Sequence, residues 1–331
     1  MGVYHSGSQS QVVIGLQNAF NTMPGTPKGF IIRKSRFTFG NYDDLIADDE
    51  LRADPNPAQQ ETGLNRCGAS LVMPMTTEEF GIFCYLFLGG YSVTGSADPY
   101  AHVYVIDDSE PFILWVECGD LKTGKYDLAE GLIVSSISVG TINKSSNMLN
   151  VTIQFEASGK FTRNGAAAQD VAPSSYSVRK HTQAMHQILV DDVLTTLITE
   201  TTWTISRTIT MLSVSDGTLY HTDFDYGDYS YDFTISGFRA AADTIVGYDD
   251  GAEHGVAIKT ERPGSATHYV LIDHNETLIK NSETPGEISG DPPVPQKVRV
   301  LPTYINHADG SSIKITIETE IADYVALLAT T

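Results

Sequence analysis

Apolar and polar residues alternate with a period of two along much of the chain, which is the pattern of strands that bury one face. This alternation, or enrichment in β-branched residues, predicts strands in the first half over residues 30–39, 69–73, 102–106, 112–117, 133–139 and 148–157. The pattern then restarts and predicts strands over residues 202–214, 231–239, 255–261, 268–272, 297–304 and 313–320. The sequence therefore predicts a mainly β protein.

One segment breaks the alternation with helical spacing. Thr76 and Glu79 fit a capping box, in which a threonine and a glutamate three residues later satisfy backbone N–H groups at a helix start. Apolar residues follow at spacings of three and four, at Phe80, Phe83, Cys84, Phe87 and Leu88. We therefore predict a helix over residues 77–88 whose broad apolar face lies on a sheet.

The chain divides into two similar halves. Residues 164–175 are small and polar and have the composition of a linker between an N-terminal unit, residues 1–163, and a second β unit, residues 176–331. Both halves present a strand, a long acidic loop and further strands in one order. Both are expected to end in a hairpin, at residues 141–157 and 304–321. This repetition predicts a tandem duplication whose second copy lacks a clear counterpart of the helix.

Composition narrows the possible functions. The 331 residues carry a net charge of −20, which repels DNA phosphates and anionic membranes and argues against sequence-specific DNA binding. Cys67, Cys84 and Cys118 are odd in number and lie in apolar surroundings, so we expect reduced, buried thiols. No apolar run could span a bilayer and no signal peptide is evident, so we expect folding in a cytosol and no membrane partner.

No pattern of a reaction centre withstands inspection. Residues 119–126 have the glycine and lysine spacing of a phosphate loop, but Tyr126 replaces the magnesium-binding hydroxyl and strands flank both sides, which favours a hairpin turn. His181 and His186 are five residues apart and complete no ligand set, so they are expected on the surface. We therefore predict a protein that is not an enzyme and has no cofactor.

Two acidic segments are candidate interaction sites. The segment over residues 41–66 is too long for a hairpin connection, and is either a flexible solvated loop or a functional arm; it carries Asp43, Asp44, Asp48, Asp49, Glu50, Arg52, Asp54 and Arg66. A second acidic loop is expected over residues 216–229. Its Asp223, Asp225 and Asp228, with Asp232, match a calcium loop poorly, and the alternative is a subunit contact made with Tyr226 and Tyr229.

The order of acidic loop, strand, helix and strands resembles the tail tube proteins of long-tailed bacteriophages. The resemblance rests on Arg52, Asp54, Pro55, Asn56 and Pro57, on the strand that follows, on the T-T-E-E-F helix, and on the later strands. It covers residues 10–160 well and the remainder loosely. It implies a virion structural protein with a β-sandwich or partial barrel and a flanking helix, whose sheets join those of its neighbours into one continuous barrel around a lumen.

The same resemblance implies roles and partners. The 41–66 arm would reach the adjacent ring, where Arg52 and Arg66 would pair with carboxylates. The partners would be other copies of the chain, three per ring if the unit is duplicated and six if it is not, with a tape measure protein, a tail terminator and a distal tail protein. DNA would pass the lumen without specific binding, past carboxylates for which Glu156 and Glu318 are candidates.

A rival interpretation is a carbohydrate-binding or adhesion module of a tail fibre. In that case Trp115, Trp203 and the tyrosines of residues 226–231 would stack on sugar rings. The apolar neighbours of Trp115 on both sides argue against it, because they are typical of a core strand.

Overall fold

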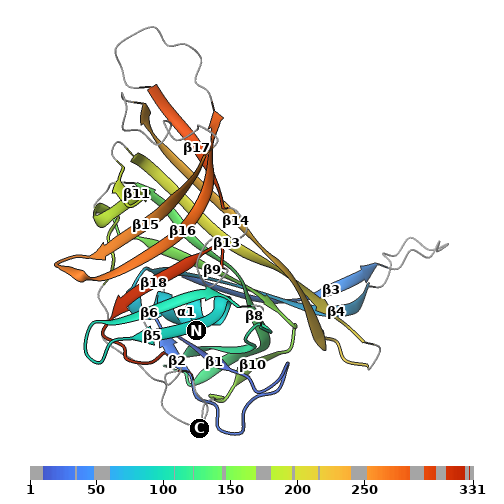
Figure 1. Ribbon diagram of the computed structural model, residues 1–331. Helices are drawn as coiled ribbons and strands as arrows, with labels where there is room; N and C mark the ends of the chain where they lie inside the picture. The colour runs from blue at the N-terminus through green and yellow to red at the C-terminus, as the bar shows by residue number, and fades with distance from the viewer. Residues whose placement is uncertain are drawn as a thin grey trace.

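A computed structural model of the chain describes residues 10–33, 36–47, 60–107, 109–121, 123–143, 147–168, 180–195, 198–214, 217–239, 252–283, 294–302, 311–324 and 328. In these ranges the protein is mainly β, with the helix α1 (Thr77–Leu88) and a short 3-10 helix, η2 (Gln183–Met185), as Figure 1 shows. The predicted fold class is confirmed, and α1 has the predicted bounds.

The strands of the first half are β1 (Ser10–Leu16), β2 (Phe30–Ile32), β3 (Arg36–Ala47), β4 (Gln60–Pro74), β5 (Gly89–Thr94), β6 (Tyr100–Ile106), β7 (Leu114–Asp120), β8 (Lys125–Asn143), β9 (Asn150–Ala157) and β10 (Phe161–Gly165). Those of the second half are β11 (His186–Val190), β12 (Val193–Leu194), β13 (Ile198–Leu212), β14 (Asp223–Arg239), β15 (Glu253–Arg262), β16 (Ser265–Glu283), β17 (Val294–Pro302) and β18 (Lys314–Thr319).

The strands form one antiparallel sheet that is not closed into a barrel. Successive neighbours are β3, β4, β9, β8, β13, β14, β17 and β16. The 19-residue strands β8 and β16 change partners along their length. The first part of β8 pairs with β7 and β10, and its later part pairs with β9 and β13. The sheet therefore runs without a break from the first half of the chain into the second.

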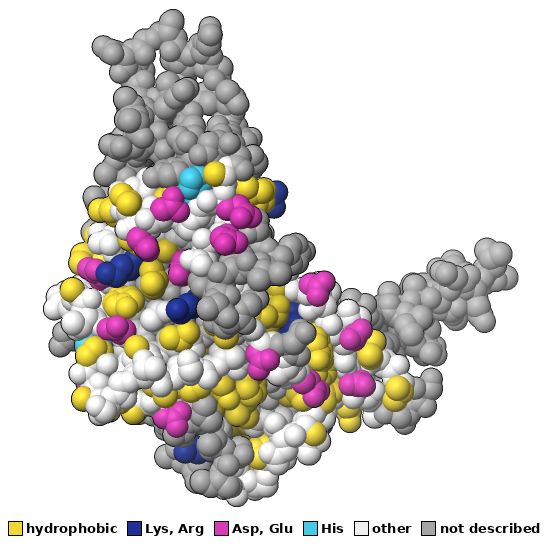
Figure 2. Space-filling view, in the orientation of Figure 1, with side chains coloured by type: hydrophobic (Ala, Val, Ile, Leu, Met, Phe, Trp, Pro, Cys, Tyr) yellow, Lys and Arg dark blue, Asp and Glu magenta, His cyan; other side chains and the backbone are white. Residues whose placement is uncertain are grey.

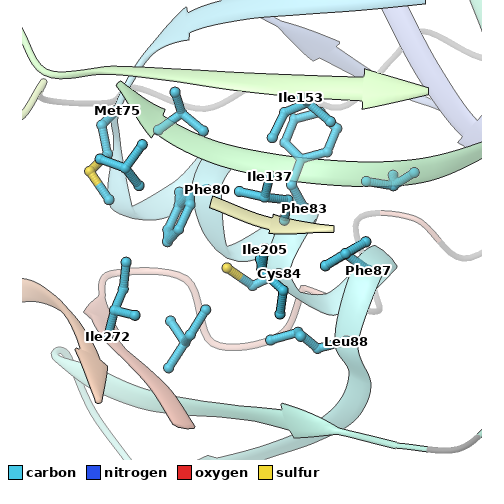
Figure 3. Packing of buried hydrophobic residues seen from close by; sticks show 14 of the residues in the cluster. Met75, Phe80, Phe83, Cys84, Phe87, Leu88, Ile137, Ile153, Ile205 and Ile272 are labelled. Carbon is cyan, nitrogen blue, oxygen red and sulfur yellow. The ribbon is translucent and has the colours of Figure 1, made fainter. Parts of the chain in front are cut away.

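Helix α1 is enclosed by this sheet rather than laid on it by one face. It contacts β5, β6, β8, β16 and β18, and eleven of its twelve residues are buried. Figure 3 shows Phe80, Phe83 and Phe87 packed among isoleucines from both halves, Ile137, Ile153, Ile205 and Ile272. We predicted that one apolar face of the helix is buried, whereas nearly the whole helix is buried. The reason is that strands of both halves cover it.

The predicted cap is formed with one change of partner. The N–H of Glu79 donates to Thr76 Oγ1 at 3.1 Å, as a capping box requires. The Glu79 carboxylate, however, accepts from the N–H of Arg33 at 2.8 Å, just past β2. Glu79 thereby fastens the start of α1 to the chain just past β2.

The C-terminal segment links the two halves. Strand β18 lies between β16 of the second half and β6 of the first. The first arm of the hairpin predicted over residues 304–321 lies outside the described residues, and its second arm contains β18. Tyr324 then donates to the carbonyl of Thr77 at 2.8 Å. A Cβ on Gly81 would lie only 2.5 Å from the Tyr324 ring, so this glycine makes room for the tyrosine.

The linker and the phosphate-loop pattern can also be compared with the structure. Residues 164 and 165 end β10, residues 166–168 are irregular, and residues 169–175 lie outside the described ranges. Residues 119–126 are a hairpin turn between β7 and β8, where Gly124 has a φ of 62° that favours glycine. The predicted turn is confirmed there.

Replacing Tyr324 tests how strongly the C-terminal segment holds α1. Tyr324→Ala should lower the free energy of unfolding by about 3–5 kcal/mol, because it leaves a cavity against Gly81 and Tyr104. Tyr324→Phe should cost about 1 kcal/mol, because the ring stays in place and the hydroxyl that bonds Thr77 is lost. Denaturant unfolding measures both, and equal costs would contradict this packing role.

Glu79 should give stability a pH dependence of defined sign. Burial raises the pKa of Glu79 from its ordinary 4.5 to about 7 in the folded state. The folded state then binds the proton more tightly, so this stabilisation is present below pH 4.5 and is lost as the pH rises to about 7. The uncharged variant Glu79→Gln lacks the effect. As the pH rises from 4.5 to about 7, the free energy of unfolding of the wild type should therefore fall relative to that of Glu79→Gln.

His181 and His186, whose pKa values burial lowers to about 4, titrate in the same range with the opposite sign. Wild type and Glu79→Gln both contain these histidines, so the contributions of the histidines cancel in the difference between the two free energies of unfolding. A difference that stayed constant between pH 4.5 and 7 would contradict the assignment to Glu79.

Candidate assembly surfaces

Hairpin β3–β4 extends away from the body of the subunit (Figure 1). Residues 67–74 of β4 pair with β9, whereas residues 60–66 pair only with β3. The far edge of β3 has no strand partner among the described residues. An open edge of this kind presents backbone N–H and C=O groups that another strand can pair with.

The acidic loop predicted over residues 41–66 is shorter than expected. Residues 41–47 and 60–66 are paired strand ends, which place Asp43 and Asp44 in β3 and Arg66 in β4. The prediction missed these strand ends because their sequence lacks the alternation of apolar and polar residues that marks a half-buried strand. Lying outside the described residues are Asp48, Asp49, Glu50, Arg52 and Asp54.

The second acidic segment is a strand and not a loop from residue 223 onward. Residues 223–229 belong to β14 and pair with the end of β13, with Asp223 opposite Leu212 and Asp225 opposite Thr210. The aspartates and aromatic residues alternate here, which is strand periodicity that the density of charge obscured. Asp223, Asp225 and Asp228 are exposed, so they remain available to a partner.

This geometry does not suit the calcium alternative. A strand spreads its side chains by about 3.3 Å per residue and turns successive ones to opposite faces, whereas a calcium loop wraps its oxygens around the ion. In the part of the chain that the structure describes, metal-type ligand atoms gather only at Asp98, His268 and Glu320.

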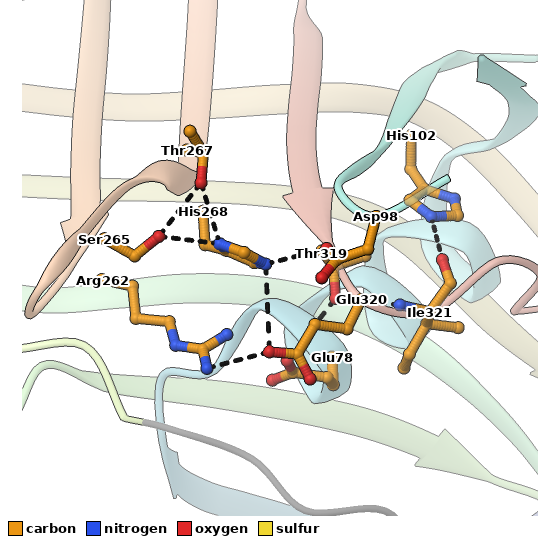
Figure 4. A network of polar contacts seen from close by, with 10 residues as sticks. All are labelled: Glu78, Asp98, His102, Arg262, Ser265, Thr267, His268, Thr319, Glu320 and Ile321. Carbon is orange, nitrogen blue, oxygen red and sulfur yellow. Dashed lines mark hydrogen bonds and ion pairs between the residues drawn. The ribbon is translucent and has the colours of Figure 1, made fainter. Parts of the chain in front are cut away.

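That group belongs to an ion-pair network (Figure 4). His268 Nε2 lies 3.1 Å from Asp98 Oδ1 and 3.9 Å from Glu320 Oε1. Arg262 Nη2 donates to the same Glu320 oxygen at 3.1 Å. Because Arg262 already supplies positive charge to Glu320, the network is an electrostatic tie between the turn before β6, hairpin β15–β16 and the segment after β18.

The side chain of Arg207 braces hairpin β13–β14 from within, and Tyr229 of the same hairpin bonds to the body. The guanidinium carbon of Arg207 lies 4.2 Å from the ring centre of Tyr226 and 4.8 Å from that of Tyr229, and the Arg207 Nε donates to the carbonyl of Gly227 at 3.0 Å. Tyr229 in turn donates to the carbonyl of Phe87, at the end of α1, at 2.8 Å. Tyr229 is thus used inside the subunit, and Tyr226 is the more exposed of the two.

The turn of this hairpin is fastened to the first half. The N–H of Asn65 in β4 donates to the carbonyl of Leu219 at 2.7 Å, and the N–H of His221 donates to the carbonyl of Ser158 at 2.7 Å. The rings of Phe20 and Phe224 also pack at 5.2 Å. These contacts fix the direction in which hairpin β13–β14 points.

Strand β8 joins the halves edge to edge. Its residues 136–143 pair with the start of β13, with Ile137 opposite Ile205 and Val139 opposite Trp203, and all four side chains are buried. On β16 the corresponding stretch, residues 279–283, pairs only with β17. The described chain therefore has one filled junction of this kind, and β3 and residues 279–283 of β16 are open edges, as are those of β2, β5 and β10.

Both halves repeat one order of strand pairing. In the first half the neighbours run β3, β4, β9, β8, β7 and β1. In the second half they run β13, β14, β17, β16, β15 and β11. Phe37, Leu71, Ile153 and Ile137 form one cross-strand row, and we match it with the row Trp203, Phe233, Val300 and Ile279 in the second half. The counterpart of hairpin β8–β9 is therefore β16–β17.

The remaining predicted residues lie apart from one another. Glu156 is exposed on β9, and Glu318 on β18 is half-buried and accepts from the Tyr269 hydroxyl at 3.1 Å. Trp115 and Trp203 are fully buried, which removes them as sugar-stacking residues. His181 is fully buried rather than on the surface as expected, where its N–H donates to the Met75 carbonyl at 2.9 Å and its carbonyl accepts from the N–H of Leu149 at 3.1 Å. Carboxylates outnumber basic side chains on the face shown in Figure 2.

A family model described as phage tail tube protein matches residues 7–300. The chain belongs to the phage tail tube protein family. It is therefore a structural protein of the bacteriophage virion, with its place in the tail. A search of curated proteins returned no significant match. In the residues that the structure describes, no helix is long and apolar enough to cross a membrane.

Membership of the tail tube family makes the open edges and the two hairpins the surfaces of most interest, because a tube subunit acts through contacts with its neighbours. Sequence reasoning missed the edge of β16 altogether. The open edge of β16 can be recognised only from the place of this strand in the repeated pairing order. That order is known only when the strand register of both halves is known.

Arg207→Lys should test the clamp on hairpin β13–β14. Lysine keeps the charge but loses the planar group that stacks on two tyrosines and bonds Gly227, so the free energy of unfolding should fall by about 1–2 kcal/mol. Arg163→Lys is the matched control, because Arg163 is exposed over Phe161 at 5.5 Å and its loss should cost under about 0.5 kcal/mol. Equal costs by denaturant unfolding would contradict the clamp.

Proposed function

We propose that this tail tube protein polymerises into stacked rings and forms the hollow conduit through which the phage genome is delivered. The observation that carries the proposal is the β8–β13 junction, which joins two similar units inside one chain. The edges that would make the same junction with further copies, residues 279–283 of β16 and the outer edge of β3, are open in the described chain. Pairing between copies would satisfy these two edges, and ring closure would leave neither of them open.

The repeated pairing order supports three chains in each ring. If β16 of one copy pairs with β3 of the next, as β8 pairs with β13, every chain contributes two units and three chains give six. By the correspondence of Ile137 with Ile279, the pairing would place residues 279–283 against the first half of β3. A ring built from one unit per chain would need six chains and would not reuse the junction.

The lumen and the tail partners belong to the same proposal. A lumen lined by carboxylates repels DNA phosphates, so that DNA passes without binding, and Glu156 and Glu318 stay candidates for that lining. The acidic residues at the end of hairpin β3–β4, Asp48 to Asp54, would reach the adjacent ring, where Arg52 and Arg66 would meet carboxylates. The tape measure protein, the tail terminator and the distal tail protein would be the partners, and the host cytoplasm the place of synthesis.

The tail-fibre alternative has weaker support in the structure. Both tryptophans that would stack on sugar rings are fully buried, and Trp203 donates its N–H to His274 Nε2 at 3.1 Å. Of the tyrosines considered for the same role, Tyr229 is bonded to the carbonyl of Phe87.

Electron microscopy of the purified protein over a range of concentrations tests the proposal. We expect rings or hollow filaments whose end-on views show threefold symmetry, with sixfold pseudosymmetry at low resolution. Strict sixfold rings of six chains would contradict reuse of the internal junction. Monomers that bind glycans and never assemble, even when supplied with tail-tip components as an initiator, would contradict the tube altogether.

A further inference from the structure

The junction between β8 and β13 inside the chain has a defined register. Ser138 lies opposite Thr204, whose hydroxyl donates to the Ser138 hydroxyl at 2.9 Å. Val139 lies opposite Trp203, and both of these side chains are buried. A shift of one residue would turn every one of these side chains to the opposite face of the sheet. A junction of the same kind between two copies would therefore keep this register.

Strand β3 carries the positions that β13 supplies to this junction. In the matched cross-strand rows Phe37 takes the place of Trp203, so the next residue, Thr38, takes the place of Thr204. Phe37 is half-buried, whereas Trp203, which has β8 beside it, is fully buried. A strand placed beside β3 would cover Phe37 in the way that β8 covers Trp203.

Strand β16 carries the positions that β8 supplies. In the same rows Ile279 takes the place of Ile137, so the next residue, Lys280, takes the place of Ser138. In the described chain residues 279–283 pair with β17 on one side only. The other side of this stretch is the edge that β13 would occupy if the internal junction were repeated.

Charge selects among the registers that keep each side chain on its face. Such registers differ by steps of two residues. Lys280 already lies opposite Arg299 of β17. A step of two residues in one direction would place Arg36 on the other side of Lys280, and like charges directly opposite each other are destabilising. The register taken from the internal junction places the uncharged Thr38 there instead.

We propose that β16 of one copy pairs antiparallel with β3 of the next so that Lys280 lies directly opposite Thr38, with Phe37 as the apolar anchor of the contact. The occupant of each edge is a second copy of this chain, because the internal junction shows how these two kinds of strand pair. The contact joins two different edges of identical subunits, so it can close into a ring. The inference rests on the proposed function and adds to it the register and the anchor residue.

Pairs of cysteines test this register. Residues directly opposite each other in an antiparallel pair have Cβ atoms about 4.5–5.5 Å apart, within reach of a disulfide after a small adjustment. Thr38→Cys with Lys280→Cys should therefore link most chains of the assembled protein to a neighbour on mild oxidation. Ser138→Cys with Thr204→Cys is the matched control, because these two positions meet inside one chain and their disulfide leaves a monomer.

An off-register pair gives the contrast. Arg36→Cys with Lys280→Cys, two residues from the expected partner, should link about fivefold fewer chains. Serine replaces Cys67 and Cys118 in every variant, so that native thiols do not form the links. If a double variant does not assemble, a mixture of its two single variants gives the same comparison, read as linked dimers.

The outcomes separate this junction from the tube itself. Assembled protein in which the Thr38 and Lys280 cysteines do not link, or link less than the off-register pair, would overturn the register and leave the proposed function intact. Dimers linked through Thr38→Cys alone would show β3 pairing with β3 and overturn it as well. A wild type that forms neither rings nor tubes would overturn the proposed function and this junction with it.

Replacing Phe37 tests the anchor. Phe37→Ala should raise the protein concentration needed for ring formation by about tenfold or more, because truncating a central aromatic residue removes much of an interface's affinity. Phe112→Ala is the matched control: Phe112 is also half-buried in the first half, but it packs on Tyr85 with ring centres 4.7 Å apart, away from β3. This variant should assemble as wild type does, and equal effects of the two substitutions would contradict the anchor.

Discussion

The backbone hydrogen bonds between β8 and β13 are the interaction on which the rest of the structure depends. They turn two similar halves into one sheet, and they bury Ile137, Val139, Trp203 and Ile205 at the seam. An antiparallel edge left open in water is prone to pair with any other edge. This chain fills one such edge internally, and β3 and the end of β16 are among the edges that stay open in its described part. In the proposed assembly these two edges continue the sheet into a neighbour.

Helix α1 packs among the strands of that sheet and forms part of the hydrophobic core. It is buried on nearly every side, capped by Thr76, fastened to Arg33 through Glu79, and locked from the other side by Tyr324. Strand β18 closes this arrangement by pairing with β6 and β16, so the last part of the chain binds the first half to the second. The single helix of the first unit thus serves the packing of both units, consistent with the lack of a clear second helix in the sequence.

Local signals in the sequence predicted much of this fold. The spacing of Phe80, Phe83 and Phe87 with the Thr76 cap gave α1 its bounds, and alternation located most strands, because those residues bury one face. Short strands such as β5, β11 and β12 were missed, since few residues carry too little pattern. Two acidic strand segments were predicted as loops because a high density of aspartates is typical of loops, whereas Asp43 and Asp225 lie on paired strands.

The assembly surfaces were harder to predict, because they depend on register over long separations. The correspondence of Ile137 with Ile279, which identifies the open edge of β16, exists only once strands more than a hundred residues apart are paired. The family resemblance led to the prediction of a tail tube protein. The order of strand pairing led to the prediction of the edges at which its subunits would join.

Hydrogen exchange of backbone amides, compared between dissociated subunits and assembled protein, tests the central claim most directly. The account predicts that outward amides of β3, over residues 36–41, and of β16, over residues 279–283, become protected on assembly, while those of the β8–β13 junction are protected in both states. Assembled protein in which β3 and β16 exchange as fast as in free subunits would contradict it.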